Sequence, residues 1–118
     1  MKKERSNIMQ TKQDYEIWTK WCSRPGLSEE ELMRLECTDT ILTAYAKEHP
    51  WYLATDADIK EWVLMPKTTS DIIIELQAVM HLEQLDVVVW LRANDYPLVP
   101  GSSGQLQWSM WERRYIDD

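Results

Sequence analysis

Five prolines and a scarcity of glycine determine how this chain can be divided into elements. The prolines stand at positions 25, 50, 66, 97 and 100, and only three glycines occur in 118 residues. Because proline cannot continue a helix and disfavours helical geometry in the residue before it, each proline predicts the end of an element. The stretches between these breaks carry apolar residues at helical spacing, so the sequence predicts a succession of helices.

The expected helices differ in how clearly their ends are marked. Ser28 opens the second helix with the clearest signal, because Glu31 completes a capping box in which each side chain bonds the other residue's free backbone donor. Asp39 projects into the apolar stripe of this helix, and an unpaired buried carboxylate is costly. We therefore expect a break near residues 37–39, with a continuous helix and a buried Asp39 as the alternative. The five predicted helices span residues 6–22, 28–49, 55–64, 71–93 and 105–115.

The stretch 71–93 carries apolar residues on two faces, which is typical of a helix buried at the centre of a bundle. The predicted fold class is therefore all-α, a compact bundle of about five helices around residues 71–93. β-branched runs favour sheet, so the alternative is an α+β fold with strands near 72–76 and 87–91. One domain, 1–118, is expected, with residues 1–6 as a disordered basic tail.

The charge distribution predicts the kind of partner. The formal net charge is -7, and residues 25–100 hold fourteen acidic but only five basic side chains. This disfavours nucleic acid and favours a basic protein partner. A helix-turn-helix built on residues 56–74 would begin its recognition helix near Asp71 with no base-reading side chain. The alternative function, a nucleic-acid-associated regulator of phage or plasmid type, would use the basic N-terminus with Arg113 and Arg114.

The N-terminus has no apolar run behind its basic residues, and no stretch has the length of a membrane span. We therefore expect a cytoplasmic protein that does not enter a membrane, with Cys22 and Cys37 as free thiols. A metal site would require these cysteines to converge with His49 and His81, and their spacing matches no ligand motif. The sequence predicts no metal and no organic cofactor.

Seven tryptophans and no phenylalanine are the oddest compositional feature. Helical spacing places Trp18 and Trp90 in the core and leaves Trp21 and Trp108 as the exposed members of two Trp-x-x-Trp pairs. So many indoles favour a homodimer. The Trp51-Tyr52 dipeptide after Pro50 is either an exposed aromatic knob or, as we favour, a plug that seals the end of the bundle.

No catalytic motif occurs, so the sequence predicts that the protein is not an enzyme. His81 and Glu83 are the one pair that a small enzyme of unknown type would use. The stretch 27–32 resembles a helix start in the acidic colicin-type immunity proteins, although the paired tyrosines and proline that carry binding in that family have no match here. The resemblance implies an inhibitor of a basic protein.

The predicted function is a non-catalytic, acidic protein-binding module that inhibits or regulates a basic partner, as immunity proteins, antitoxins and phage-encoded inhibitors do. Tight protein–protein interfaces usually have aromatic side chains at the centre and charged side chains around them. The predicted partner-binding residues lie at two expected helix starts and in the aromatic loop between them: Glu29, Glu30, Glu31, Trp51, Tyr52, Asp56, Asp58 and Glu61.

Overall fold

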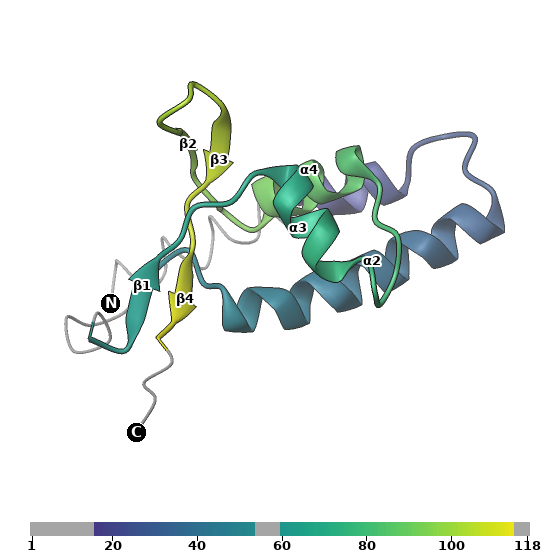
Figure 1. Cartoon of the computed structure of the whole chain (residues 1–118). Helices are drawn as coiled ribbons and strands as arrows, with labels where there is room; N and C mark the ends of the chain where they lie inside the picture. Colours follow the sequence, from purple (N-terminus) through teal and green to yellow (C-terminus); the bar gives the residue numbers. More distant parts are fainter. Residues whose placement is uncertain (1–15, 54–59, 115–118) are drawn as a thin grey trace, which may run out of the picture.

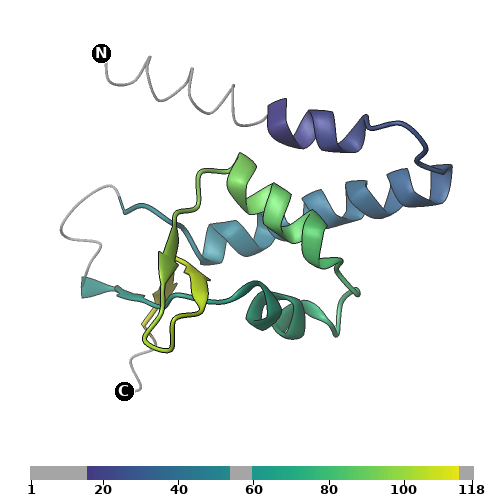
Figure 2. The ribbon, with the colours of Figure 1, turned by 90° about the horizontal axis from the view of Figure 1, so that it is seen from above.

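The structure, a computed structural model, describes residues 16–53 and 60–114 and combines helices with short strands. The all-α prediction is therefore wrong. The helices are residues 16–22, α2 (Glu29–Glu48), α3 (Thr69–Leu76) and α4 (Gln84–Ala93). They lie together, and the strands stand at one end of them (Figures 1 and 2). None of the helices in the described ranges combines the length and the hydropathy of a membrane span. The predicted tail, residues 1–6, lies outside those ranges.

Helix α2 is continuous over 20 residues, so the expected break near 37–39 is wrong. The predicted capping box between Ser28 and Glu31 is present and fixes its first turn. Asp39 is tolerated in the apolar stripe because it is not unpaired: the indole Nε1–H of Trp90 donates to its Oδ1 at 2.7 Å. A hydrogen bond offsets most of the free-energy cost of removing a polar group from water, and here the donor belongs to α4.

The predicted central helix 71–93 is two helices, α3 and α4, separated by residues 77–83. The two short helices pack on each other, and each buries one side, with Ile72 of α3 and Val87, Trp90 and Leu91 of α4 in the core. Ile74 and Leu85, which the sequence placed on one of the two apolar faces, are exposed. The turn between them inserts Leu82, which is 1% exposed, into the core. The alternative strands near 72–76 and 87–91 are also wrong, because both stretches are helical.

Two further predicted helices are replaced by strands. The described end of 55–64 contains β1 (Trp62–Leu64), and 105–115 contains β3 (Leu106–Trp108) and β4 (Trp111–Arg113). Apolar side chains at 106, 108 and 110 alternate along the chain, which is the period of a strand, and long-range pairing stabilises it.

The strands form two antiparallel pairs. β4 pairs with β1, and β3 pairs with β2 (Leu98–Pro100). Trp108 joins the two pairs, because it lies opposite Leu98 on one side and bridges to Lys67 on the other. Gly104, with φ +86°, turns the chain between β2 and β3 in a conformation that glycine adopts without strain.

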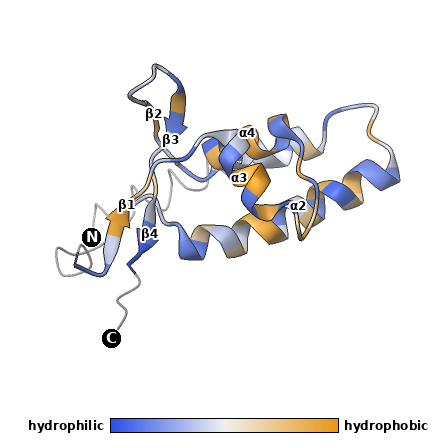
Figure 3. Cartoon of the chain, viewed as in Figure 1, coloured by the Kyte–Doolittle hydropathy of each residue, from blue (hydrophilic) through white to orange (hydrophobic). Residues whose placement is uncertain are grey.

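Three tryptophans, Trp18, Trp90 and Trp108, lie in the core (Figure 3 shows the hydropathy along the ribbon). Burial of Trp18 and Trp90 confirms the prediction. The expected exposure of Trp108 is wrong, since its side chain is 2% exposed and its Nε1–H donates to the Thr69 hydroxyl. Trp21 is half-buried, and its Nε1–H donates to the buried carboxylate of Asp86 at 2.9 Å. Indole donors therefore tie the helices together by long-range hydrogen bonds.

Candidate functional site

The predicted partner-binding residues separate into two groups at opposite ends of α2. Glu29, Glu30 and Glu31 form its first turn, and Trp51 and Tyr52 follow its last. A helix of this length spans about 30 Å, so these groups do not form one continuous surface. The first group has a local structural role, because negative charge there stabilises the helix start. Hydrogen bonds from the backbone and hydroxyl of Ser28 also lower the pKa of Glu31.

The aromatic pair beyond α2 is on the surface. Trp51 is 38% exposed and Tyr52 is 65% exposed, and their ring centroids lie 5.5 Å apart. The favoured prediction, that these two side chains seal the end of the bundle, is therefore wrong. They form the alternative, an exposed aromatic pair. The Trp111 backbone N–H donates to the carbonyl of Pro50 at 2.8 Å, which fixes the start of this loop against β4.

Glu61 belongs to the same end of the molecule as the aromatic pair. It is exposed, its carbonyl accepts from the Arg114 backbone N–H, and its carboxylate lies 3.9 Å from Arg113. The Arg113 guanidinium lies 4.9 Å from the ring centroid of Trp62. Asp56 and Asp58 lie outside the described residues. We call residues 48–52, 61–62 and 111–113 the α2 corner.

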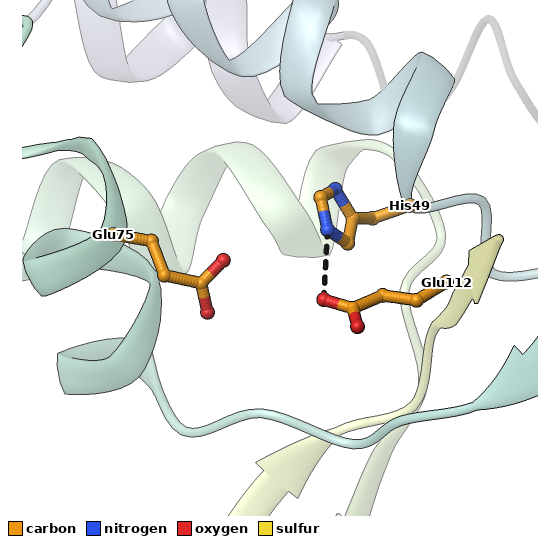
Figure 4. A group of neighbouring side chains, drawn as sticks. All are labelled: His49, Glu75 and Glu112. Carbon is orange, nitrogen blue, oxygen red and sulfur yellow. Dashed lines mark hydrogen bonds and ion pairs between the residues drawn. The ribbon is translucent and has the colours of Figure 1, made fainter. Parts of the chain in front are cut away.

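A network of polar side chains lies beneath the α2 corner and joins three elements (Figure 4). His49 caps the end of α2, and its ring stacks on that of Tyr45 with 3.9 Å between the centroids. His49 Nε2 lies 3.1 Å from Glu112 Oε2 on β4. The Tyr45 hydroxyl donates to Glu75 Oε1 on α3 at 3.1 Å. Burial, reinforced by the charge of Glu75, raises the pKa of Tyr45 far above its usual range.

Lys67 supplies the cation at the centre of this network. Its Nζ lies 2.6 Å from Glu112 Oε2 and 2.7 Å from Glu75 Oε2. Burial lowers the pKa of Lys67, but the hydrogen bonds to Glu112 and Glu75 outweigh it, so the net pKa is raised. The hydrogen bond from Lys67 is the main cause that lowers the pKa of Glu112, and His49 adds to it. The Lys67 ammonium and the Glu112 carboxylate therefore hold each other in their charged forms.

The hydrogen bonds of His49 show what this network can do chemically. Its Nδ1 lies 3.0 Å from the Tyr45 carbonyl, and its Nε2 faces the Glu112 carboxylate. A general base needs a ring nitrogen that can reach a substrate proton, and both nitrogens are taken by protein acceptors. This geometry suits a structural latch between α2 and β4 rather than an acid–base catalyst.

Three of these side chains could also serve as metal ligands. One ligand atom each from His49, Glu75 and Glu112 lies within 4.8 Å of the others. Lys67 Nζ contacts both carboxylates at hydrogen-bonding distance, so the positive charge that a divalent ion would bring is already present. Of the four residues weighed as ligands from the sequence, His49 belongs to this cluster and the other three lie elsewhere: Cys22 in the groove beside α2, Cys37 exposed on α2 and His81 in the α3–α4 turn.

A pocket of about 380 Å³ opens beside the network. It is lined by Glu48, His49, Glu112 and Arg113, which all belong to the α2 corner. A second pocket, of about 340 Å³, lies between the helix 16–22 and α2 and includes Cys22. Burial, together with the charges of Asp39 and Asp86, raises the pKa of the Cys22 thiol, which disfavours the nucleophilic thiolate.

The pair considered for an enzyme is on the surface. His81 Nε2 and Glu83 Oε1 lie 3.8 Å apart, and their side chains are 77% and 53% exposed. An exposed pair in a turn has no enclosing groups to orient a substrate, so this geometry lends the enzyme alternative no support.

Sequence reasoning considered His49 but missed Tyr45, Lys67, Glu75 and Glu112, because they are distant in the chain and match no motif. One usable signal exists for Glu112. Trp108, Met110 and Glu112 stand at every second position, the period of an extended chain, in the segment that forms β3 and β4. No family model, curated protein or solved structure matches the chain.

Proposed function

We propose that this protein is a non-catalytic, acidic protein-binding module that inhibits or regulates a basic partner protein through the α2 corner. The observation that carries the proposal is the exposure of Trp51 and Tyr52 side by side. Tryptophan and tyrosine are enriched among the residues that dominate binding energy, because they bury a large area at low cost in side-chain entropy.

The acidic groups around the aromatic pair support a basic partner. Glu48 and Glu61 are exposed at the same corner, and the sequence adds Asp56 and Asp58 between them. Opposite charge accelerates association and excludes partners of the wrong sign. Glu29, Glu30 and Glu31 at the far end of α2 contribute to the long-range field of the molecule rather than to this contact.

The test is a quantitative capture from the native source with matched variants. Tyr52→Ala removes an aromatic side chain that is 65% exposed at the corner. Met33→Ala removes an apolar, non-aromatic side chain that is 66% exposed on α2 near its other end. We expect capture of a basic protein that is reduced at least tenfold by Tyr52→Ala and unchanged by Met33→Ala, and the same pattern with purified components. Equal capture by both variants would contradict the proposal.

A second candidate function is favoured by the arrangement of α3 and α4. Two helices joined by a turn and followed by the β2–β3 hairpin resemble the chain order of winged helix-turn-helix domains, many of which bind DNA. The turn, residues 77–83, is longer than the usual three or four residues. Between residues 69 and 93 the sequence holds four acidic side chains and one basic one, Arg92, so phosphates would be repelled.

The nucleic-acid alternative also assigns a role to Arg113 and Arg114. Both are engaged within the chain, since Arg113 approaches Glu61 and Trp62, and Arg114 Nε donates to the Trp62 carbonyl at 3.3 Å. Fluorescence anisotropy with a labelled random-sequence duplex separates the two functions. The protein-binding module predicts no binding at physiological salt, whereas binding that weakens steeply with added salt would favour the nucleic-acid regulator.

A further inference from the structure

The pocket of the α2 corner carries an inference about the chemistry of the partner, which rests on the proposed function. The pocket measures about 380 Å³. This volume is within the range of sites that hold small ligands. Glutamates outnumber cations at this corner. Within the ranges that define the corner, three carboxylates, those of Glu48, Glu61 and Glu112, accompany one permanent cation, Arg113.

Two carboxylate groups in the pocket retain acceptors for a ligand. Glu48 is exposed and forms no ion pair with any residue in 16–53 or 60–114. In Glu112, the contacts of His49 and Lys67 both fall on Oε2, and Oε1 accepts no hydrogen bond from the part of the chain that the structure describes. Figure 4 shows this second oxygen directed away from His49.

The cation that lines the pocket is already engaged. Arg113 lies 3.9 Å from Glu61 and 4.9 Å from the Trp62 ring centroid, so its charge faces partners within the chain. A guanidinium over an indole also recurs in this molecule, because Arg24 lies 3.6 Å from the ring centroid of Trp21. The exposed Trp51 stands three residues after Glu48 and offers the same kind of ring face.

We propose that the pocket between Glu48 and Glu112 receives an arginine side chain of the partner, whose guanidinium pairs with these two carboxylates. A guanidinium suits this site because its planar fork bonds two carboxylates and stacks on aromatic rings, whereas a lysine ammonium acts as a point charge. In this contact the basic group of the partner, attracted by the acidic corner, would lie beside the exposed side chains of Trp51 and Tyr52.

The experiment titrates the whole protein with the blocked pentapeptide Gly-Gly-Arg-Gly-Gly and follows amide and indole chemical shifts. We expect shifts confined to residues 48–52 and 111–113, absent with the peptide that carries glutamine instead of arginine. Glu48→Gln should weaken the affinity at least threefold. Glu36→Gln, which removes an equal charge about three turns earlier on the same helix, should leave it unchanged, and the lysine peptide should bind more weakly.

Three results would overturn the inference. They are equal affinity in Glu48→Gln and the parent protein, shifts centred elsewhere, or corner shifts produced by inorganic phosphate but not by the arginine peptide. This titration requires no partner, so its failure is separate from that of the proposed function. Capture that depends on Tyr52 without arginine binding would retain the interaction surface and remove only the arginine pocket.

Discussion

The helix interfaces and the α2 corner both combine tryptophan with acidic side chains, but they arrange them in opposite ways. At the interfaces the indole N–H donates to a carboxylate from another helix, Trp21 to Asp86 and Trp90 to Asp39. At the corner Trp51 and the neighbouring Glu48 are exposed. The comparison shows that residue type does not distinguish a structural tryptophan from an exposed one, such as the proposed contact residue Trp51, whereas burial and a long-range hydrogen bond do.

The largest effect is expected at the helix interfaces. Asp86 is 2% exposed and accepts from Trp21 Nε1 and, at 3.4 Å, from Arg34 Nη2. Asp86→Ala would leave both donors without their acceptor and lower the free energy of unfolding by about 3 kcal/mol. Urea denaturation measures this loss.

Glu83→Ala is the control for this prediction. Glu83 is exposed at the start of the same helix and makes no side-chain cap. A surface substitution of this kind should change the free energy of unfolding by less than about 0.5 kcal/mol. Equal losses in the two variants would contradict the comparison.

A smaller effect is expected beneath the corner. Lys67→Met removes the cation shared by Glu75 and Glu112. The substitution should lower the free energy of unfolding by about 2 kcal/mol at neutral pH, because hydrogen bonds to charged groups are lost. The lowered pKa of Glu112 contributes stability that is present above its unfolded pKa and is lost as the pH falls through the folded value.

The difference between Lys67→Met and the parent protein should therefore shrink below about pH 4, where the carboxylates become protonated in both proteins. Urea midpoints at neutral pH and at acid pH test this. If the difference in the free energy of unfolding stays constant over the whole pH range, Lys67 acts by packing alone. That result would contradict a stabilising role for its ion pairs with Glu75 and Glu112.

The smallest change in stability is expected at the corner itself. Tyr52→Ala removes an exposed ring that makes no hydrogen bond to any described residue. The free energy of unfolding should therefore change by less than about 0.5 kcal/mol, as is usual for surface substitutions. Thermal unfolding followed by circular dichroism checks this. A loss near that of Asp86→Ala would make Tyr52 part of the core and contradict its assignment to an interaction surface.

The sequence was informative where local signals act. The capping box at Ser28 predicted the start of α2, and Pro50 its end. Helical spacing placed Trp18 and Trp90 in the core. These features depend on residues within a few positions of each other, and their physics is local.

The errors arose where distant residues decide the structure. Asp39 remains inside a continuous helix because Trp90, 51 positions later, donates to it. The segment around Trp111 is a strand because β1 pairs with it, and the network joins His49 to Glu112 across 63 positions. The alternation at residues 106–110 indicates a strand, but a single sequence does not say which distant segment pairs with it, so both the sheet and the polar network of the site were missed.

The homodimer stays a prediction, although its argument from exposed indoles at both ends has weakened. Trp18 and Trp108 are buried, and the Trp21 indole N–H donates a hydrogen bond to Asp86. Light scattering would give the mass in solution.

The central claim is that Trp51 and Tyr52 form an open surface, which we propose as the contact surface, while the indoles of Trp18, Trp90 and Trp108 belong to the core. Hydroxyl-radical footprinting read by mass spectrometry measures this on the intact protein. We predict rapid oxidation of Trp51 and Tyr52 and slow oxidation of Trp18, Trp90 and Trp108, which are 5%, 3% and 2% exposed. Addition of the captured partner should protect the first pair alone. Slow oxidation of Trp51 and Tyr52 in the free protein would contradict the account.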